Sequence, residues 1–532
     1  MLILLNTNDI FLKKRKEIIN KMSSVMKDKI IATREYREHL LKDPYRPTYH
    51  FTVPDDCGGP GDPNGAFFAD GIYHLMYLYK NSKTNGFHWG HISSKDLLHW
   101  RNHPDALTVY EGDEGCFSGG GFLDDDNTAY LTFRKFASKD ESMDKSGIAI
   151  AYSKPPYDEW KRIEPIAVNA DEWGIKDVNI DGETVHLACA DPSNIWKMNG
   201  YYYMELGNLI VLNKYGREET SPKKYQGDWT ELYRSKDLHN WEYVHRFYEN
   251  THNGSDWPDN TEDAMCSSFL PLYDAKQNGK LTGKWLQMFI SHNKGCQHYV
   301  GTLKNEKFYP EVHGRMSWND RTFFAPEALI DDKNRHIVWN WILDNLGNDF
   351  EIFGWSGVYS FPRILWWKND TLHIAPADEL DNLQYNHQQI SSFDNKVNIK
   401  NGESFRMKSI WDIKHNQKVG FKVRVSNDGK EYTEIYIDRK SKTLVMDTTN
   451  SGISEWFKIK EKAPFALTDG ELLHMDIFVD KSVIEVFVNE RQAITRRVFP
   501  PDPKNSLGVE VIGNPNEIKR LDSWEMFPTN PY

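Results

Sequence analysis

A short unit that recurs along the chain constrains the fold more than any other feature of the sequence. It is an aromatic-rich strand followed by Ser-Lys-Asp-Leu-x-x-Trp, which occurs at Ser94–Trp100 and again at Ser235–Trp241. A looser version spans Tyr152–Trp160. Around these units, short strands alternate with turn residues, and helical periodicity is almost absent. A strand-and-turn unit that repeats in this way indicates a repeated β architecture.

An aromatic-rich strand precedes each of the three units, and two more strands of this type follow along the chain: the five are Tyr73–Tyr79, Ala129–Phe133, Tyr201–Glu205, Trp285–Ser291 and His336–Ile342. Their spacing leaves room for five units of four strands each. Four-stranded units repeated around an axis form a β-propeller, whose central channel collects residues from the start of each innermost strand. The sequence therefore predicts a five-bladed β-propeller over residues 44–368, with an irregular all-β domain as the alternative.

The sequence changes character after residue 368, and we expect a linker over residues 369–385. In the run His474–Asn489, β-branched and aromatic residues alternate on either side of Asp480-Lys481-Ser482, which is typical of a hairpin. Residues 386–532 are therefore predicted to form a β-sandwich, so that the fold class is all-β. Residues 1–43 are rich in Lys, Glu, Ile and Leu, which predicts a helical or partly disordered arm.

Composition narrows the possible partners and the compartment. The net charge is −12 and no basic stripe is present, so nucleic acid is not an expected partner. The five cysteines form no C-x-x-C pair, which favours buried free thiols in a reducing compartment. No stretch has the length of a membrane span, and the N-terminus lacks the order of a signal peptide, so a cytoplasmic location is expected. Nothing in the sequence indicates a metal or a cofactor.

The first candidate catalytic residue is Asp62, in the pentad Gly61-Asp62-Pro63-Asn64-Gly65. Pro63 fixes its own φ and keeps Asp62 in an extended conformation, while Gly65 permits a tight exit into the following strand. A carboxylate held rigidly at the start of a strand suits a nucleophile, which must be positioned closely against its target carbon. The alternative is an ordinary surface turn, since these residue types are common in turns.

Two further acidic positions match the same design. Asp191 lies in Ala190-Asp191-Pro192, which repeats the Asp-Pro device before the third unit, and Glu262 precedes the fourth unit. In a propeller the loops that carry Asp62, Asp191 and Glu262 would converge on one pocket. Glycoside hydrolysis normally uses a pair of carboxyl groups on either side of the bond that breaks. The three acids together therefore indicate a glycosidase site.

The ordered series of motifs resembles glycoside hydrolase family 32, the invertases, inulinases and levanases. The family's Asn-Asp-Pro-Asn-Gly motif is matched by Gly61–Gly65, and its Glu-Cys motif is loosened to Glu262-Asp263-Ala264-Met265-Cys266. The other matching segments are Trp89–Trp100, Phe117-Ser118-Gly119, Ala190-Asp191-Pro192, Phe324–Glu327, Gly354–Arg363, Phe478–Val488 and Arg497–Pro500. The match is collinear from about residue 43 to the end, which is more specific than any single motif.

The resemblance implies a retaining enzyme that cleaves β-fructofuranosidic linkages through a covalent fructosyl-enzyme intermediate. By this resemblance Asp62 would be the nucleophile, Glu262 the acid/base and Asp191 the residue that stabilises the transition state. The residues implied to line the fructose subsite are Asn64, Trp89, Phe117, Ser118 and Trp341. A retaining pair has its carboxyl groups about 5–5.5 Å apart, which we expect for Asp62 and Glu262. Asp263 is expected to be a solvated turn carboxylate.

Three departures from the family pattern affect the expected substrate. Gly59-Pro60-Gly61 replaces the family's Trp-Met-Asn, Leu78 replaces a Gln, and Ala190 replaces the Arg before Asp191. A site that loses a hydrogen-bond donor discriminates strongly against the substrate that needs it. We therefore expect either another cation reaching the volume beside Ala190, or a preference for a different or longer fructoside.

Other functions use the same sequence features. A fructosyltransferase would employ the same residues, and a propeller that binds fructan without cleaving it, or that serves only as an interaction module, would lack the need for three collinear acids. Arabinan-cleaving propellers are the runner-up for substrate, but they generally lack the C-terminal sandwich. The expected partner is a fructose-containing oligosaccharide or polysaccharide.

Overall fold

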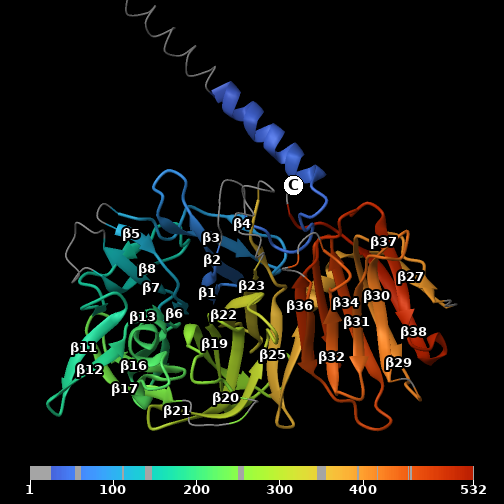
Figure 1. The fold of residues 1–532 in the computed structure, drawn as a ribbon. Helices are drawn as coiled ribbons and strands as arrows, with labels where there is room; N and C mark the ends of the chain where they lie inside the picture. The colour runs from blue at the N-terminus through green and yellow to red at the C-terminus, as the bar shows by residue number, and fades with distance from the viewer. Residues whose placement is uncertain are drawn as a thin grey trace, which may run out of the picture. The chain divides into compact units, whose positions relative to one another are not determined.

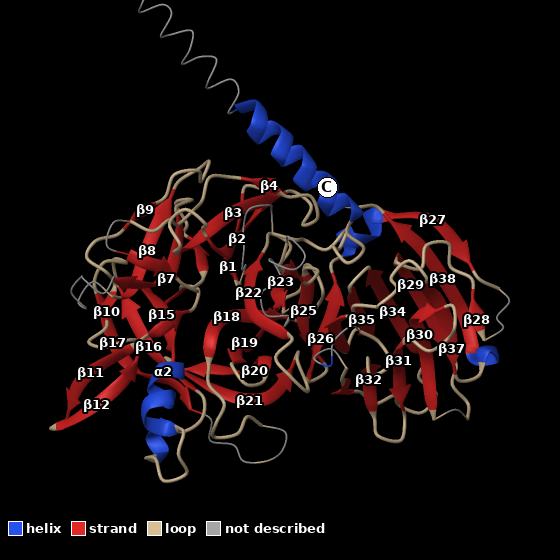
Figure 2. Cartoon of the chain, turned by 45° about the horizontal axis from the view of Figure 1, so that its top comes forward, coloured by secondary structure: helices blue, strands red, loops and turns tan. Residues whose placement is uncertain are grey.

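In the computed structural model, the described residues are 26–530 except 54–60, 111–112, 138–145, 250–253, 255–256, 344–354, 392–394, 416, 453–454 and 456–457. The chain divides into two compact units. A small unit comprises Met1–Arg46 with Pro531–Tyr532, and a large one comprises Pro47–Asn530. Strands make up most of the large unit (Figure 2).

The first two blades of the large unit share one ten-stranded sheet. Blade 1 consists of β1 (Pro63–Ala69), β2 (Ile72–Lys80), β3 (Phe87–Ser94) and β4 (Arg101–Asn102). Blade 2 consists of β6 (Gly121–Leu123), β7 (Ala129–Ala137), β8 (Gly147–Ser153) and β9 (Lys161–Arg162). The sheets are joined by β5 (Asp113–Cys116), which pairs with both β3 and β7, and β10 (Val168–Asn169) pairs with β8.

The next three blades are separate antiparallel sheets. Blade 3 contains β13 (Ala190–Pro192), β14 (Trp196–Met198), β15 (Tyr201–Gly207), β16 (Trp229–Ser235) and β17 (Trp241–Glu249). Blade 4 contains β18 (Met265–Tyr273), β19 (Leu281–Ser291), β20 (Gly295–Lys304) and β21 (Lys307–Arg315). Blade 5 contains β22 (Phe323–Ile330), β23 (His336–Ile342), β24 (Val358–Tyr359), β25 (Arg363–Lys368) and β26 (Thr371–Pro376).

The innermost strands of the blades close into a ring, as a propeller requires. β1 contacts β6, β13 contacts β7, β18 contacts β13, and β22 contacts both β18 and β1. In Figure 1 these strands surround the middle of the blue-to-yellow half of the large unit. The ring and the strand order are consistent with the predicted five-bladed propeller. A separate hairpin of β11 (Ile175–Ile180) and β12 (Glu183–Ala188) and the short helix α2 (Leu209–Val211) extend blade 3.

The recurring sequence unit forms the same turn in different blades. In blade 1 the Asp96 carboxylate accepts hydrogen bonds from the backbone N–H groups of Leu98 and His99. In blade 3 Asp237 accepts in the same way from two consecutive backbone N–H groups. The leucines that follow, Leu97 and Leu238, both have φ near +65° and bury their side chains. The repeat therefore marks the turn that leads to the outermost strand of a blade.

The C-terminal part is a sandwich of two six-stranded sheets. One sheet has the order β27 (Gln384–Gln389), β38 (Ile518–Met526), β29 (Ser404–Trp411), β34 (Leu473–Asp480), β35 (Val483–Val488) and β36 (Gln492–Arg497). The other has β28 (Lys396–Val397), β37 (Ser506–Ile512), β30 (Lys418–Ser426), β31 (Thr433–Asp438), β32 (Thr443–Asp447) and β33 (Lys460–Pro464). Their inner faces bury a common apolar core that includes Trp411, Phe421 and Ile477.

Two domain boundaries differ from the sequence predictions. β26 pairs with β25, so the last blade extends to Pro376 rather than ending at residue 368. The sandwich begins with β27 at Gln384, two residues before the predicted start at 386. The connection between the two is a 3₁₀ helix, Asp378–Leu383, rather than the longer linker predicted over 369–385.

The propeller and the sandwich meet at a buried network of charged groups. His50 pairs through Nδ1 with Asp480 and through Nε2 with Glu485, at 2.9 and 3.2 Å. Arg363 of β25 reaches the other oxygen of Glu485 at 2.5 Å. Asp480 ends β34 and Glu485 lies within β35, and the pairing of these two strands confirms the hairpin predicted around Asp480-Lys481-Ser482. The hairpin therefore anchors the sandwich to the propeller.

The small unit contains one described helix, over residues 26–42. This agrees with the helical character predicted for the N-terminal arm, while residues 1–25 of that prediction lie outside the described part of the chain. Within the described residues, none of the helices has the length and apolar character needed to cross a membrane.

Candidate active site

Asp62 stands immediately before β1, in a loop that its own backbone fixes. The Asp62 carbonyl accepts a hydrogen bond from the Leu78 N–H at 3.0 Å, and the Gly61 N–H donates to the Leu78 carbonyl at 2.7 Å. Gly65 has φ of +60°, the left-handed conformation predicted for the exit into the strand. The loop is thus held to β2 on one side and turned by Gly65 on the other, which fixes the position of Asp62.

One oxygen of the Asp62 carboxylate has two partners, whereas the other has none among the described residues. Ser118 Oγ donates a very short hydrogen bond to Oδ2, and Cys266 Sγ lies 3.4 Å from the same oxygen. The residue is only 8% exposed. The Oδ1 atom is therefore left available to a ligand while Oδ2 fixes the orientation of the carboxylate.

Asp191 lies in β13 and shares a neighbour with Asp62. Its Oδ2 atom is 3.6 Å from Cys266 Sγ, so this single thiol bridges the two carboxylates. Cys266 can reach both because its backbone adopts φ of +49° at an irregular position in β18. Side chains from four blades, with Ser118 included, therefore meet at one point, as predicted for the channel of a propeller.

Arg134 of β7 supplies a cation at the place where the family's Arg is missing. Its Nη1 atom is 3.8 Å from Asp191 Oδ1, and its guanidinium lies 4.2 Å from the ring centroid of Phe136. Arg134 is buried, and its Nε and Nη2 atoms have no hydrogen-bond partner. A buried cation therefore lies beside Asp191, the residue that follows Ala190, and two of its nitrogen atoms have no described partner.

The pKa values of both buried aspartates are raised. For Asp62 burial raises the pKa, the Ser118 hydrogen bond opposes that change, and the charge of Asp191 adds to it. For Asp191 burial again raises the pKa, while the charges of Arg134 and His292 lower it. Two carboxylates in one site with nearby cations are a common arrangement in enzymes that stabilise positive charge in the transition state.

The two acids before β18 point to different partners. Glu262 accepts hydrogen bonds from Arg315 on both oxygens, at 2.7 and 2.9 Å, and from Gln297 at 3.0 Å. Asp263 accepts from the His292 backbone N–H at 3.1 Å and pairs with His292 Nδ1 at 2.8 Å. The prediction that Asp263 is a solvated turn carboxylate is wrong, because Asp263 is completely buried beneath His292.

The described contacts do not join Glu262 to Asp62. Gln297 and Arg315 belong to β20 and β21, the outer two strands of blade 4. Asp62 instead stands at the innermost strand of blade 1, with Ser118 and Cys266 as its described partners. The expected spacing between the Asp62 and Glu262 carboxyl groups therefore stays a prediction.

Two residues predicted to line the fructose subsite support the Asp62 loop. Asn64 donates to the Asp62 carbonyl at 2.9 Å and accepts from the Gly119 N–H at 3.1 Å, which ties blade 1 to blade 2. Trp89 is 0% exposed and belongs to the apolar core of the first two blades. Because a completely buried ring offers no surface to a ligand, we place Trp89 beneath the loop rather than in the wall of the subsite.

Two other predicted residues have partly exposed rings. Phe117 contacts Phe136, and Phe136 stacks on the half-exposed Trp173 with a centroid distance of 4.1 Å. Trp341 contacts Phe324, and its ring N–H has no described partner. These rings have the faces and the free donor that a sugar-binding surface uses.

Sequence reasoning missed His292, Arg134 and the role of Cys266. His292 lies in a hairpin turn, and Arg134 lies within a strand, so neither belongs to a motif. The buried free thiols were predicted, and Cys116, Cys189, Cys266 and Cys296 are indeed free and buried. Nothing in that prediction indicated that Cys266 contacts both carboxylates. Among the described residues, no group of three or more His, Cys, Asp or Glu could hold a metal ion.

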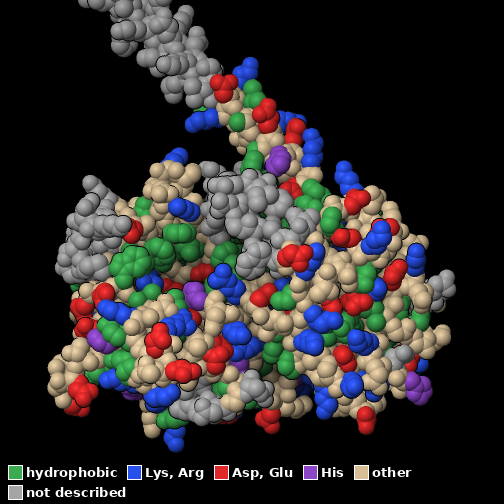
Figure 3. Space-filling view, viewed as in Figure 1, with side chains coloured by type: hydrophobic (Ala, Val, Ile, Leu, Met, Phe, Trp, Pro, Cys, Tyr) green, Lys and Arg blue, Asp and Glu red, His purple; other side chains and the backbone are tan. Residues whose placement is uncertain are grey.

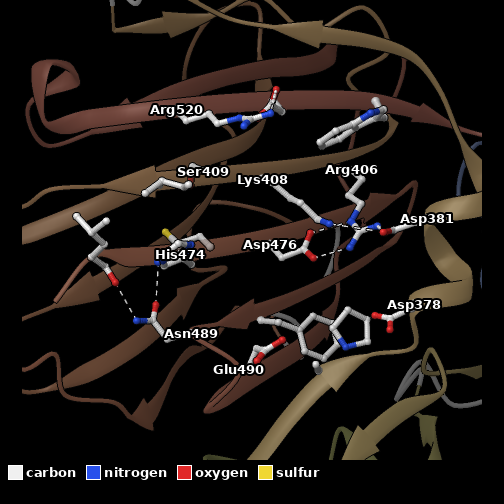
Figure 4. Close-up of a pocket in the computed structure, with 18 of the residues that line it drawn as sticks. Asp378, Asp381, Arg406, Lys408, Ser409, His474, Asp476, Asn489, Glu490 and Arg520 are labelled. Atoms are coloured by element: carbon white, nitrogen blue, oxygen red, sulfur yellow. Dashed lines mark hydrogen bonds and ion pairs between the residues drawn. The ribbon is translucent and has the colours of Figure 1, made fainter. Parts of the chain in front are cut away.

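A pocket of about 980 Å³ lies where the 3₁₀ helix and β26 meet the sandwich (Figure 4). Its charged residues pair with one another: Arg406 binds Asp476 and Asp381. Figure 3 shows charges of both signs interspersed over the visible face, with hydrophobic side chains gathered beside a hollow on the propeller half. The carboxylate oxygen without a described partner and the buried Arg134 donors lie in the propeller instead.

Comparison with known proteins shows the family of the chain. The chain matches the glycosyl hydrolases family 32 N-terminal domain over residues 50–376 and the family's C-terminal domain over residues 379–525. It is 27% identical to a levanase of Bacillus subtilis over 515 residues, which cover 89% of this chain and 69% of the levanase. It is also 27% identical to a sucrose-6-phosphate hydrolase of Zymomonas mobilis, covering 88% of this chain and 90% of that protein.

Solved structures show the same fold. Fructan 1-exohydrolase IIa from Cichorium intybus matches with a TM-score of 0.74 at 20% identity, over 92% of this chain and 98% of that one. Exo-inulinase from Aspergillus awamori matches with a TM-score of 0.72 at 19% identity, over 92% of this chain and 99% of that one. With both family domains matched in order, the chain belongs to glycosyl hydrolase family 32 and is a glycoside hydrolase that acts on β-fructofuranosides.

Proposed function

We propose that the chain hydrolyses its fructoside with retention of configuration, with Asp62 as the nucleophile and Asp191 as the residue that stabilises the transition state. Asp62 Oδ1 attacks C2 of the fructosyl unit while the bond from C2 to the leaving oxygen breaks, and a fructosyl-enzyme forms. Water then attacks C2, which releases fructose and restores the carboxylate. The negative charge of Asp191 stabilises the oxocarbenium-like transition state of both steps.

The observation that supports this proposal is the thiol of Cys266, within 3.4 Å of Asp62 and 3.6 Å of Asp191. Two carboxylates that share one thiol neighbour, each 8% exposed, lie close enough to act on one sugar ring. Ser118 and the loop around Asn64 hold Asp62 in a fixed orientation. A nucleophile held in this way loses little entropy when it attacks.

The leaving oxygen also needs a proton. The resemblance implies that Glu262 donates this proton. We look for the proton donor among the residues of the fourth blade. Glu262 already accepts hydrogen bonds from Arg315 on both of its oxygens. A neighbouring residue whose donor atom has no described partner is therefore the second candidate for the proton donor. That neighbour is His292, which pairs with Asp263.

For the substrate class, we propose a β-linked fructan or fructooligosaccharide. The levanase, the fructan 1-exohydrolase and the exo-inulinase to which the chain is similar bear names of fructan-cleaving enzymes. The buried Arg134 donors beside Asp191 support recognition of a sugar with several hydroxyl groups. Transfer of the fructosyl unit to a second sugar would use the same residues, and the matched C-terminal domain disfavours an arabinan-cleaving propeller.

The test is the substitution Asp62→Ala with a substrate panel. The wild-type protein is incubated with levan, inulin, 1-kestose, sucrose and arabinan, and the products are separated by chromatography. We expect fructose from at least one fructoside, and a loss of several orders of magnitude in D62A with an unchanged thermal transition. Asp332→Ala, at an exposed turn, is the matched control and should keep full activity. Near-normal turnover by folded D62A would rule out the assignment.

A further inference from the structure

The contacts of Glu262 do not suit it to act as the proton donor of this site. Arg315 Nη2 binds Oε1 at 2.7 Å, Arg315 Nη1 binds Oε2 at 2.9 Å, and Gln297 binds Oε2 at 3.0 Å. The Asp259 N–H adds a fourth contact to Oε1 at 3.2 Å. A carboxyl group that gives a proton to a substrate must expose one oxygen to it. Glu262 is 1% exposed, and both of its oxygens are occupied.

His292 pairs with Asp263, the residue that follows Glu262. It follows β19 directly, in the turn to β20, and its Nδ1 atom is 2.8 Å from Asp263 Oδ2. The backbone N–H of His292 donates to the other Asp263 oxygen at 3.1 Å, so both ends of the pair are fixed. The His292 side chain is 40% exposed, whereas that of Asp263 is 0% exposed.

The ring of His292 faces the proposed site. Its centroid is 5.8 Å from that of Phe324, and Phe324 in turn contacts Trp341, which was predicted to line the fructose subsite. Asp191 and Asp62 are near enough for their negative charges to act on the imidazole. With Nδ1 bound to Asp263, Nε2 is the ring atom left to meet a ligand, since no described residue hydrogen-bonds it.

We propose that His292 is the proton donor and acceptor of the reaction and that Asp263 is the positioning residue that holds its ring. This inference rests on the proposed function of Asp62. In the first step the proton on Nε2 passes to the leaving oxygen as its bond to C2 breaks and the bond from Asp62 to C2 forms. In the second step Nε2 takes a proton from the attacking water, the new C2–O bond forms, and the bond to Asp62 breaks. The imidazole ends each cycle protonated, so the atoms and charges balance.

The electrostatic surroundings favour the protonated ring before reaction. Burial alone would lower the pKa of His292, but the hydrogen bond and charge of Asp263, with the charges of Asp191 and Asp62, raise that pKa above its usual value. The other charged group at this corner is Arg217, whose Nη2 atom lies 3.8 Å from Asp263 Oδ1. An imidazole paired with a buried carboxylate in this way can both give and take a proton near neutral pH.

The test compares two substrates that differ in how much they need a proton donor. The leaving group of levan is a sugar alkoxide, which needs a proton. The leaving group of p-nitrophenyl β-D-fructofuranoside is a stable phenolate, which does not. We expect His292→Gln to lower kcat/KM for levan by about 10²–10⁴-fold and to affect the nitrophenyl substrate far less. Glu262→Gln should lower the two rates by a similar factor, since it disturbs only contacts within the protein, with Arg315, Gln297 and Asp259. His239→Gln, at an exposed turn, should match the wild type.

Two further measurements separate catalysis from folding. In His292→Ala, sodium azide should accelerate turnover of the nitrophenyl substrate, because the anion attacks the fructosyl-enzyme without a base. In Asp263→Asn, the alkaline limb of the levan kcat/KM profile should move to lower pH, because the carboxylate that raises the pKa of His292 is gone.

The possible outcomes are distinct. A leaving-group-dependent loss in E262Q, or levan turnover by H292Q within a few-fold of the wild type, would overturn the inference while leaving Asp62 in place. An unmoved alkaline limb in D263N would overturn the positioning role of Asp263. Loss of activity on both substrates in D62A, but only on levan in H292Q, supports the two assignments separately. A wild-type protein inactive on both substrates would overturn the proposed function and, with it, this inference.

Discussion

Arg134 is the residue that reconciles this site with the missing Arg of the family motif. The guanidinium reaches Asp191 from the neighbouring blade, at 3.8 Å, instead of from the position before it in sequence. A cation in this place lowers the pKa of Asp191, opposing the effect of burial, and keeps two donors directed at a ligand.

Replacement of Arg134 should therefore change both binding and the pH profile. We expect Arg134→Ala to raise KM for levan, because two buried donors are lost, and to move the acidic limb of kcat/KM to higher pH. The direction follows because the charge of Arg134 lowers the pKa of Asp191, so its removal lets that pKa rise. Steady-state kinetics between pH 4 and 8 measure both effects, with Arg101→Ala, an exposed position, as the control. An acidic limb that moves to lower pH would contradict the account.

How much of the site the sequence predicts differs from residue to residue. The meeting of Asp62 and Asp191 at one thiol agrees with the convergence expected from their sequence positions, since each carries an Asp-Pro pair at an innermost strand. The role of Glu262 as acid/base stays a prediction; its partners Gln297 and Arg315 lie on the two outer strands of blade 4, which the motif gave no means to predict. Arg134 and His292 act through contacts between blades, which no local pattern of residues reveals.

The loop from Gly61 to Gly65 is the element on which the nucleophile depends. Gly65 adopts φ of +60°, and a Cβ atom there would lie 2.7 Å from Leu131 Cδ2 and 3.1 Å from Trp89 Cζ3. The loop therefore packs directly on the buried Trp89 ring, and Asn64 ties it to the next blade. Any shift at Gly65 passes to Asp62 through three residues of fixed backbone.

Gly65→Ala tests this coupling, with Gly71→Ala as a matched control. Both glycines have positive φ, so both substitutions carry a backbone cost of about 1–2 kcal/mol. Only G65A meets neighbouring side chains, since a Cβ atom at Gly71 has nothing within 4 Å. We expect G65A to lose at least tenfold in kcat and G71A to lose stability alone, measured by kinetics and thermal unfolding. Equal kcat values for the two variants would show that the loop is not rigidly coupled.

At the same scale, strand patterns predicted the blades better than their ends. The aromatic-rich strands and the Asp-capped turns were correctly recognised, because strand alternation and turn chemistry are local properties. The boundary at 368 was wrong, because Asn369-Asp370 is a hairpin turn and not the start of a linker. Both residues have φ near +50°, as a tight two-residue hairpin requires, and the chain returns along β25 as β26.

At the scale of the molecule, the propeller and the sandwich are joined through charge pairs that are fully buried. His50 and Arg363 both bind Glu485, and their side chains are 0% and 1% exposed. Burial would raise the pKa of Glu485, but the charges and hydrogen bonds of Arg363 and His50 together outweigh burial and lower that pKa to about 2. For His50 the bonds to Asp480 and Glu485 outweigh burial and raise the pKa.

Glu485→Gln should thus destabilise the whole large unit, because it leaves Arg363 without its buried partner. Breaking a buried pair costs about 3–5 kcal/mol, against less than about 1 kcal/mol for Glu311→Gln in an exposed pair with Lys284. Because the folded-state pKa of Glu485 is lowered, its contribution is present above the unfolded pKa and is lost as the pH falls toward 2. Urea unfolding at pH 7 and pH 4 should show a smaller difference between E485Q and wild type at the lower pH. A difference that grows on acidification would contradict this sign.

The central claim is that Asp62 forms a covalent bond to the fructosyl unit. The most direct measurement is mass spectrometry of protein quenched in acid during turnover of p-nitrophenyl β-D-fructofuranoside, followed by peptide mapping. The account predicts the added mass of one fructosyl residue on the peptide that contains Asp62, absent in D62A, and a first-formed product of retained configuration by NMR. A label on another peptide, or an inverted product without any label, would contradict it.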